Sequence, residues 1–215
     1  MTQSERNLLG HGSLDEGDSI SGELKNATLP VVLLHSPYCW SGHCTAAEQT
    51  VSWREGWRNL EEYHRQGKAK TIGVSNFDLG LFTELLSITT APVGVVQDRE
   101  VRLLAAKTFA VYMAYSSLGT QWEHKLGHNP VFASETLQRI AHLRGLSVAQ
   151  VVTSWLLQSG VVAIPRSADP AHIRELGIFI TEQSAGNEKK EGVRVYLEEE
   201  DMRAIEALDG TLGEF

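Results

Sequence analysis

The sequence predicts an α/β fold, an incomplete (β/α)8 TIM barrel in which parallel strands alternate with helices. Short apolar runs rich in β-branched residues recur along the chain, as in buried parallel strands. Segments with apolar residues at helical spacing lie between these runs. Polar side chains follow the runs directly, at the strand ends where such a barrel places its ligand site. The five expected strands begin near Val31, Thr71, Val93, Ala110 and Val161, whereas a closed barrel has eight strands in about 250 residues.

Composition indicates one folded domain with an N-terminal tail. Residues 1–29 mix small and polar residues with isolated leucines and show no periodicity, so a disordered tail is expected before a domain at 30–215. The chain has 27 acidic and 19 basic residues, a net charge of −8, which disfavours nucleic acid and anionic membranes as partners. Only Cys39 and Cys44 are present, and the sequence has neither a secretory nor a membrane-spanning apolar run. A cytoplasmic protein with reduced cysteines is therefore expected.

The first expected strand, residues 31–34, is followed by His35. A buried strand of this kind delivers the histidine to the ligand end of the sheet, where it is either catalytic or, more often, structural. Cys39, His43 and Cys44 follow in a segment expected to form a loop over the barrel mouth. Because no second pair of ligands completes a four-ligand set, this segment predicts no metal site.

Residues 67–77 are the stretch around which the chain is organised. Apolar side chains at helical spacing precede them, and Gly67 supplies the left-handed residue that ends a helix. Residues 71–74 have strand composition, and Ser75 and Asn76 stand at their carboxyl end. A hydroxyl and an amide there suit hydrogen bonding to an amide-bearing ligand. The alternative is that both side chains only cap the helix that follows.

The other helices are expected from their caps and apolar periodicity. Asp78 is the expected N-cap of the helix after the central stretch. Further helices are expected at residues 134–144 and from Ser147 onward, where Ser147 and Gln150 form a capping box. A last helix is expected within residues 197–208, with acidic residues in its first turn.

Polar or aromatic residues also follow the later strands. Gln97 ends the third strand and Tyr115 the fourth, where an aromatic side chain either packs in the core or faces a ligand. After the fifth strand, Arg166 and Ser167 precede a helix that opens with proline. A basic residue, a hydroxyl and a helix N-terminus at one place predict an anion site.

The stretch at 67–77 resembles the signature of the aldo-keto reductases, Gly-Lys-x-(Arg/Lys)-x-Ile-Gly-Val-Ser-Asn-Phe. The resemblance implies an NADP(H)-dependent oxidoreductase that interconverts carbonyls and alcohols. It implies that Ser75 and Asn76 hold the nicotinamide carboxamide and that Gln97 lies against the same amide. It also implies that His35, which ends a strand similar to the family's His-(Trp/Ser)-Pro strand, polarises the substrate carbonyl and is the one catalytic candidate.

Two later segments extend the resemblance. Residues 115–119 are similar to the family's Tyr-Ser-Pro-Leu-Gly, which implies that Tyr115 stacks on the nicotinamide ring. Residues 164–175 are similar to a signature beginning Ile-Pro-Lys-Ser, whose lysine and a later arginine hold the 2′-phosphate of NADP(H). The pyrophosphate contacts implied are Ser116, Leu118 and Thr120, and the contacts implied near the 2′-phosphate and adenine are Arg166, Ser167, His172 and Glu175.

The resemblance covers residues 30–208 and corresponds to the later five β/α units of the family's barrel. The family's proton-donor tyrosine, its lysine and its aspartate lie on the earlier strands and have no counterpart in this sequence. Three readings remain open: an NADP(H)-dependent reductase of small carbonyl compounds that is impaired or inactive alone, a non-catalytic NADP(H)-binding or regulatory subunit, and a truncated gene product. Five strands also leave sheet edges through which chains can associate.

Overall fold

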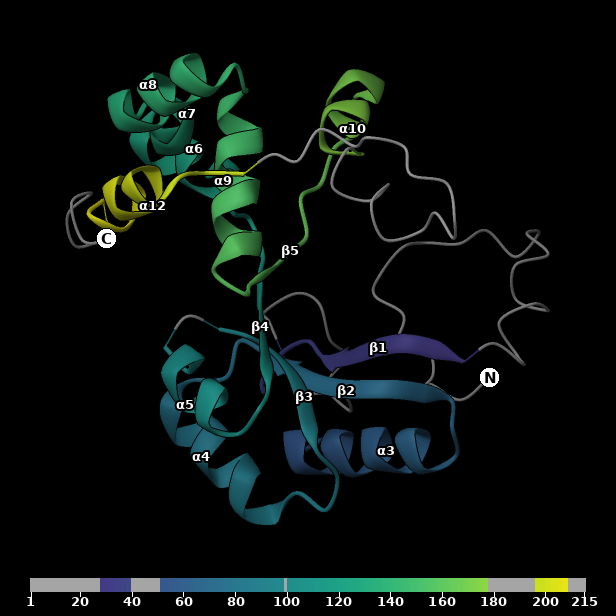
Figure 1. Cartoon of the computed structure of the whole chain (residues 1–215). Coiled ribbons are helices and arrows are strands. Elements are labelled where there is room, and N and C mark those ends of the chain that lie inside the picture. The colour runs from purple at the N-terminus through teal and green to yellow at the C-terminus, as the bar shows by residue number, and fades with distance from the viewer. Residues whose placement is uncertain (1–27, 40–50, 99, 178–195, 209–215) are drawn as a thin grey trace. The chain divides into compact units, whose positions relative to one another are not determined.

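The computed structural model describes residues 28–39, 51–98, 100–177 and 196–208 (Figure 1). The chain divides into two compact units, Met1–Met113 and Ala114–Phe215. The expected tail lies outside the described residues except at its end, because Leu29 already begins a strand. Cys39 is disulfide-bonded, so the expectation of reduced cysteines is wrong. None of the described helices is long and apolar enough to span a membrane.

The first unit alternates strands and helices, as the sequence predicts. Strands β1, β2, β3 and β4 pair in that order, and every adjacent pair is parallel. The elements are β1 (Leu29–Leu34), α3 (Trp53–Arg65), β2 (Ala69–Ser75), α4 (Leu79–Ile88), β3 (Val93–Gln97), α5 (Arg102–Lys107) and β4 (Val111–Ala114).

The core of this unit lies between the sheet and the helices that cover one of its faces (Figure 1). Helix α3 is amphipathic and buries Trp53, Trp57 and Leu60, which is the apolar face expected from the spacing of these residues. Ile72 and Val74 of β2 are each only 1% exposed and pack in the same cluster. The buried face of the helix thus fixes the strand that ends at Ser75.

Strands β2 and β3 approach closely at a register shift. Ile72 faces Val93 but Gly73 faces Val95, so Gly94 is an extra residue in β3. A Cβ atom on Gly73 would lie 2.0 Å from the carbonyl oxygen of Val95, a position that only glycine can occupy. Beyond the shift, Ser75 is aligned with Gln97.

Helix α4 is capped by Asp78, whose Oδ1 accepts a hydrogen bond from the backbone N–H of Leu81 at 2.8 Å. The prediction of this cap is confirmed. The alternative that Ser75 and Asn76 cap the helix is wrong, and their side chains are left for other contacts.

The second unit is mainly helical. Ser134 caps α8, and Ser147 and Gln150 form the predicted capping box at the start of α9. Helices α6 and α7 are not predicted from the sequence, because α6 begins at a left-handed glycine without a side-chain cap and α7 has only 4 residues. The elements are α6 (Thr120–Leu126), α7 (Pro130–Ala133), α8 (Glu135–Arg144), α9 (Val148–Gln158), β5 (Val162–Ala163), α10 (Pro170–Gly177) and α12 (Glu199–Glu206).

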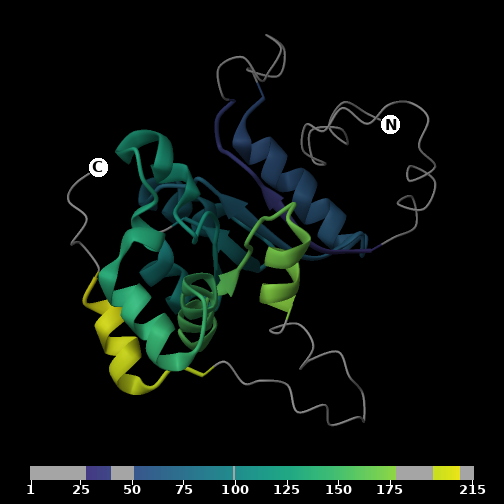
Figure 2. The same cartoon turned by 90° about the horizontal axis from the view of Figure 1, so that it is seen from above.

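Helix α12 lies beside α8 (Figure 2), and polar contacts fix both this helix and Leu197 just before it. Arg144 Nε donates to Asp201 Oδ2 at 2.7 Å, and the carboxylate of Asp201 is buried. The side chain of Gln158 bonds the backbone of Leu197 twice, accepting from its N–H at 2.8 Å and donating to its carbonyl at 3.0 Å. The predicted terminal helix is therefore an integral part of the second unit.

Candidate functional site

Three polar side chains meet where β2 and β3 end. Ser75 is 2% exposed, and its hydroxyl donates to Gln97 Oε1 at 3.3 Å. Asn76 Nδ2 donates to Ser75 Oγ at 3.1 Å. The register of parallel strands brings these residues to one edge of the sheet, as the sequence predicts for a ligand site.

The backbone of Asn76 is left-handed, with φ of 57°. Asparagine adopts this conformation more readily than most residues, and here it turns the side chain toward the end of β1. Asn76 Nδ2 donates to the carbonyl oxygen of His35 at 2.7 Å. The amide thus joins the carboxyl ends of two strands, and its orientation is fixed by two acceptors.

Two polar groups of this cluster are available to a ligand. Asn76 Oδ1 accepts no hydrogen bond from the part of the chain that the structure describes, because both recorded bonds of this side chain use Nδ2. Among the described residues, Gln97 Nε2 donates to Met113 Sδ alone, at 2.9 Å, and a thioether is a weak acceptor. The cluster therefore offers one free acceptor and one weakly engaged donor, the complement of a primary carboxamide.

His35 lies at the end of β1, exposed, and its backbone carbonyl is the acceptor for Asn76. The residue therefore has a structural part in the site through its main chain. Tyr38, three residues on, is 66% exposed. The catalytic role of the His35 imidazole stays a prediction.

The residues after β4 belong to the second unit. Tyr115 is 50% exposed, and Ser116 has a left-handed backbone with φ of 51°. A turn follows in which the N–H of Gly119 donates to the carbonyl of Ser116 at 3.0 Å, and Thr120 then begins α6. Where the family has proline, Ser117 donates its hydroxyl to the carbonyl of Ala114 at 3.1 Å, which stabilises the turn in another way.

The residues after β5 form the expected approach to a helix N-terminus. Asp169 Oδ1 accepts from the N–H of Ala171 at 2.7 Å, and Ser167 Oγ accepts from the N–H of Asp169 at 3.0 Å. Arg166 is exposed and has no ion pair with any described residue. The loop therefore presents a guanidinium beside a helix N-terminus, an arrangement that suits a phosphate group.

The last two residues implied near the adenosine lie on α10. His172 is exposed, whereas Glu175 is half-buried. The carboxylate of Glu175 accepts a hydrogen bond from the hydroxyl of Ser147, the N-cap of α9. Sequence reasoning identifies Ser147 and Gln150 only as a capping box and misses this contact, since nothing in the spacing relates residue 147 to residue 175.

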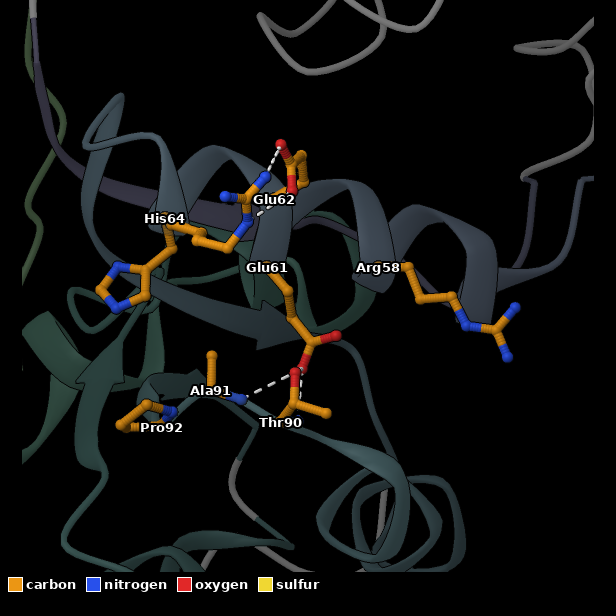
Figure 3. A pocket seen from close by; sticks show the side chains of 8 residues that line it. Arg58, Glu61, Glu62, His64, Thr90, Ala91 and Pro92 are labelled. Atoms are coloured by element: carbon orange, nitrogen blue, oxygen red, sulfur yellow. Dashed lines mark hydrogen bonds and ion pairs between the residues drawn. The ribbon is translucent and has the colours of Figure 1, made fainter.

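A separate depression of about 430 Å³ lies at the other end of the strands of the first unit, between α3 and the residues that lead into β3 (Figure 3). Its central carboxylate is Glu61, whose Oε1 accepts from the N–H groups of Thr90 at 2.6 Å and Ala91 at 3.1 Å. Burial raises the pKa of Glu61. The hydrogen bonds from these backbone N–H groups and from the threonine hydroxyls lower it by more, so the net shift is downward. The carboxylate is engaged in fixing the loop, which gives this depression a structural role.

Comparisons with solved structures define the class of fold. An aldo/keto reductase from Brucella melitensis aligns with a TM-score of 0.64 at 24% identity and covers 88% of this chain and 66% of its own. An aldo-keto reductase of the silkworm Bombyx mori, solved in complex with NADPH, aligns with a TM-score of 0.64 at 24% identity, covering 85% of this chain and 54% of its own. The predicted fold, part of a (β/α)8 barrel, is confirmed.

The family follows from the sequence match. The model of the aldo/keto reductase family matches residues 15–178, well over half of the chain, and the chain belongs to this family. Deoxymugineic acid synthase 1 of rice is 38% identical over 130 residues, and aldose reductase B of Dictyostelium discoideum is 33% identical over 133 residues. These matches cover 57% and 58% of this chain but only 41% of each relative.

Proposed function

We propose that the chain binds NADP(H) as part of an oxidoreductase that interconverts small carbonyl compounds and alcohols. The observation that carries the proposal is the pair of amides at the carboxyl ends of β2 and β3. Asn76 offers the free acceptor Oδ1, and Gln97 offers the donor Nε2. A nicotinamide carboxamide has one NH2 group and one carbonyl oxygen, so it can satisfy both. The silkworm relative solved with NADPH supports the same choice of cofactor.

The remaining contacts are assigned by the family resemblance. Tyr115, with half of its surface exposed, is proposed to stack on the nicotinamide ring. Ser116, Leu118 and Thr120 are proposed to bind the pyrophosphate, while Arg166, Ser167 and His172 lie near the 2′-phosphate and Glu175 contacts the adenine. When bound, the cofactor supplies the hydride that reduces a carbonyl, and His35 is proposed to help polarise that carbonyl.

A polypeptide of these 215 residues is proposed to lack turnover on its own. The tyrosine, lysine and aspartate that handle the proton in the family have no counterpart in it, and loss of a general acid alone costs about 10² to 10⁴-fold in rate. The same observation favours the alternative function, a non-catalytic NADP(H)-binding or regulatory subunit. The polypeptide is expected to leave an aromatic aldehyde unreduced when NADPH absorbance is followed, and turnover of ~1 per second or more would overturn this part of the proposal.

Association through a sheet edge is proposed for the same polypeptide. In the described part of the chain, β1 pairs with β2 along one edge and is the first strand of the sheet. An unpaired strand edge carries a row of backbone donors and acceptors that favour another strand. Analytical ultracentrifugation is expected to show self-association, and a monodisperse monomer over a wide concentration range would argue against it.

The cofactor site is tested by titrating the protein with NADPH and following its fluorescence. Gln97→Glu keeps the shape of the side chain but replaces the donor with a carboxylate oxygen, so we expect affinity to fall by about 10-fold, or about 1.4 kcal/mol. The control is Gln66→Glu, the same change at the exposed end of α3, which is expected to leave affinity unchanged. The proposal would be refuted if the unmodified protein did not bind NADPH. It would also be refuted if Gln97→Glu and Gln66→Glu bound NADPH with equal affinity.

A further inference from the structure

The first turn of α9 is joined to the end of α10 by side-chain hydrogen bonds. The hydroxyl of Ser147 accepts from the N–H of Gln150 at 3.1 Å and donates to Glu175 Oε1. Gln150 bonds in both directions, because its Oε1 accepts from the N–H of Ser147 at 3.0 Å and its Nε2 donates to the carbonyl of Glu175 at 3.1 Å. The capping box therefore serves two helices.

Helix α10 depends on such contacts, because none of its residues is buried. Without an apolar face in a core, a helix of 8 residues has little to fix its position. Glu175 is held through both its side chain and its backbone carbonyl. Its carboxylate also lies at the N-terminus of α9, where the helix dipole favours a negative charge.

The hydroxyl proton of Ser147 is not needed to cap α9. Capping requires only an oxygen that accepts from the N–H of Gln150, and the proton is directed instead to Glu175 Oε1. This leaves Oε2 of the carboxylate without a recorded bond to any described residue. A carboxylate held through one oxygen presents the other in a defined direction, and a donor such as an exocyclic amino group fits it.

We propose that Ser147 and Gln150 are positioning residues for the adenine end of the cofactor. They hold Glu175 so that its second oxygen accepts from the 6-amino group of adenine. The inference rests on the proposed function, since it assumes that NADP(H) is the ligand. It adds the first turn of α9, a segment outside the family signatures, to the parts of the chain that set cofactor selectivity.

Substitutions at position 147 separate the cap from the contact. Ser147→Asp retains an N-cap acceptor but removes the donor and sets a second negative charge against Glu175. Ser147→Thr retains both acceptor and donor. Ser134→Ala is the matched control, because Ser134 caps α8 through the N–H of Leu137 at 3.4 Å and has no recorded contact with α10.

The ligand series separates the adenine end from the nicotinamide end. Affinities are measured for NADPH, for its hypoxanthine analogue, in which a carbonyl replaces the 6-amino group, and for reduced nicotinamide mononucleotide, which lacks adenosine. The unmodified protein is expected to prefer NADPH to the hypoxanthine analogue by about 10-fold, as for one hydrogen bond to a charged group. Ser147→Asp is expected to lose this preference and to bind the mononucleotide normally, whereas Ser147→Thr and Ser134→Ala keep the preference.

The outcomes distinguish this inference from the proposed function. Failure of the unmodified protein to bind NADPH would overturn both. Binding of NADPH with the same base preference in Ser147→Asp would overturn the inference alone. Hydrogen exchange without any ligand gives an independent reading: the amides of α10 are expected to lose protection in Ser147→Asp but not in Ser134→Ala, and equal protection in the two variants would refute the positioning role.

Discussion

Replacement of Glu61 by glutamine is expected to destabilise the first unit in a pH-dependent way. Its Oε1 accepts from the N–H of Thr90, from the hydroxyl of Thr90 at 3.0 Å and from the N–H of Ala91 (Figure 3). Thr89 is also within reach at 3.1 Å, but its single proton has a closer acceptor, the carbonyl of Ala91 at 2.6 Å. Three bonds to a charged oxygen therefore determine the size of the effect.

The expected loss in Glu61→Gln at pH 7 is about 2 kcal/mol. Hydrogen bonds to an ionised acceptor are roughly twice as strong as neutral ones, so each of the three bonds loses about 0.5 to 1 kcal/mol when the charge is removed. The Glu61 side chain is only half-buried, so water can replace part of each bond. Because Thr90 is exposed, the lower half of this range applies best to its two contacts. The control is Glu62→Gln on the same helix, whose carboxylate bonds the exposed side chains of Arg65 and Gln66 and no others in the described ranges.

The sign of the pH dependence follows from the lowered pKa of Glu61. A carboxyl group with a lower pKa in the folded chain stabilises the fold above its unfolded pKa, about 4.3, and this contribution disappears as the pH falls through the folded value. Urea unfolding between pH 7 and pH 3 is followed by tryptophan fluorescence, to which the first unit contributes through Trp57, a residue that is 1% exposed and donates to Thr89 at 3.1 Å. The free energies of unfolding of the unmodified protein and of Glu61→Gln should converge toward pH 3. A difference between them that stays constant from pH 7 to pH 3 would refute the reasoning.

Three further substitutions test other contacts. Gly73→Ala brings a Cβ to 2.0 Å from the carbonyl of Val95 and should cost about 3 kcal/mol or more in thermal unfolding; a near-neutral result would contradict the close approach of β2 and β3. Arg144→Ala leaves the buried carboxylate of Asp201 without its partner at 2.7 Å and should cost about 3 kcal/mol, restored in part when Asp201→Asn is added. Arg166→Ala should weaken NADPH more than NADH by about 1 to 3 kcal/mol, and equal losses on titration would exclude a 2′-phosphate contact.

Most of the fold of the first unit can be predicted from local signals. Helix α3 ends where Gly67 adopts φ of 72°, and α4 starts where Asp78 caps it, both as expected from residue type. These features depend on neighbours in sequence, which is why the pattern suffices. Helices α6 and α7 escape prediction because their ends are set by turns and short-range packing, with a left-handed Gly119 in place of a side-chain cap before α6.

The candidate site is predictable only in part. The grouping of Ser75 and Gln97 follows from the rule that parallel strands bring their carboxyl ends to one edge. The contacts that orient the side chains do not follow from it. The bond from Asn76 to the carbonyl of His35 and the bond from Gln97 to Met113 Sδ join residues 41 and 16 positions apart. Such contacts depend on how strands and side chains pack in three dimensions.

Strand β3 contains one extra residue relative to β2, because Gly94 has no partner in the pairing of the two strands. The chain is fixed on both sides of this residue: Ala91 is held by Glu61, and Gln97 is aligned with Ser75. Deletion of the extra residue would straighten the ladder and still leave Gln97 opposite Ser75, whereas an insertion that shifted the register would turn its side chain to the other face. The strand therefore tolerates loss of the extra residue better than a further insertion, because its register controls which way the amide at its end points.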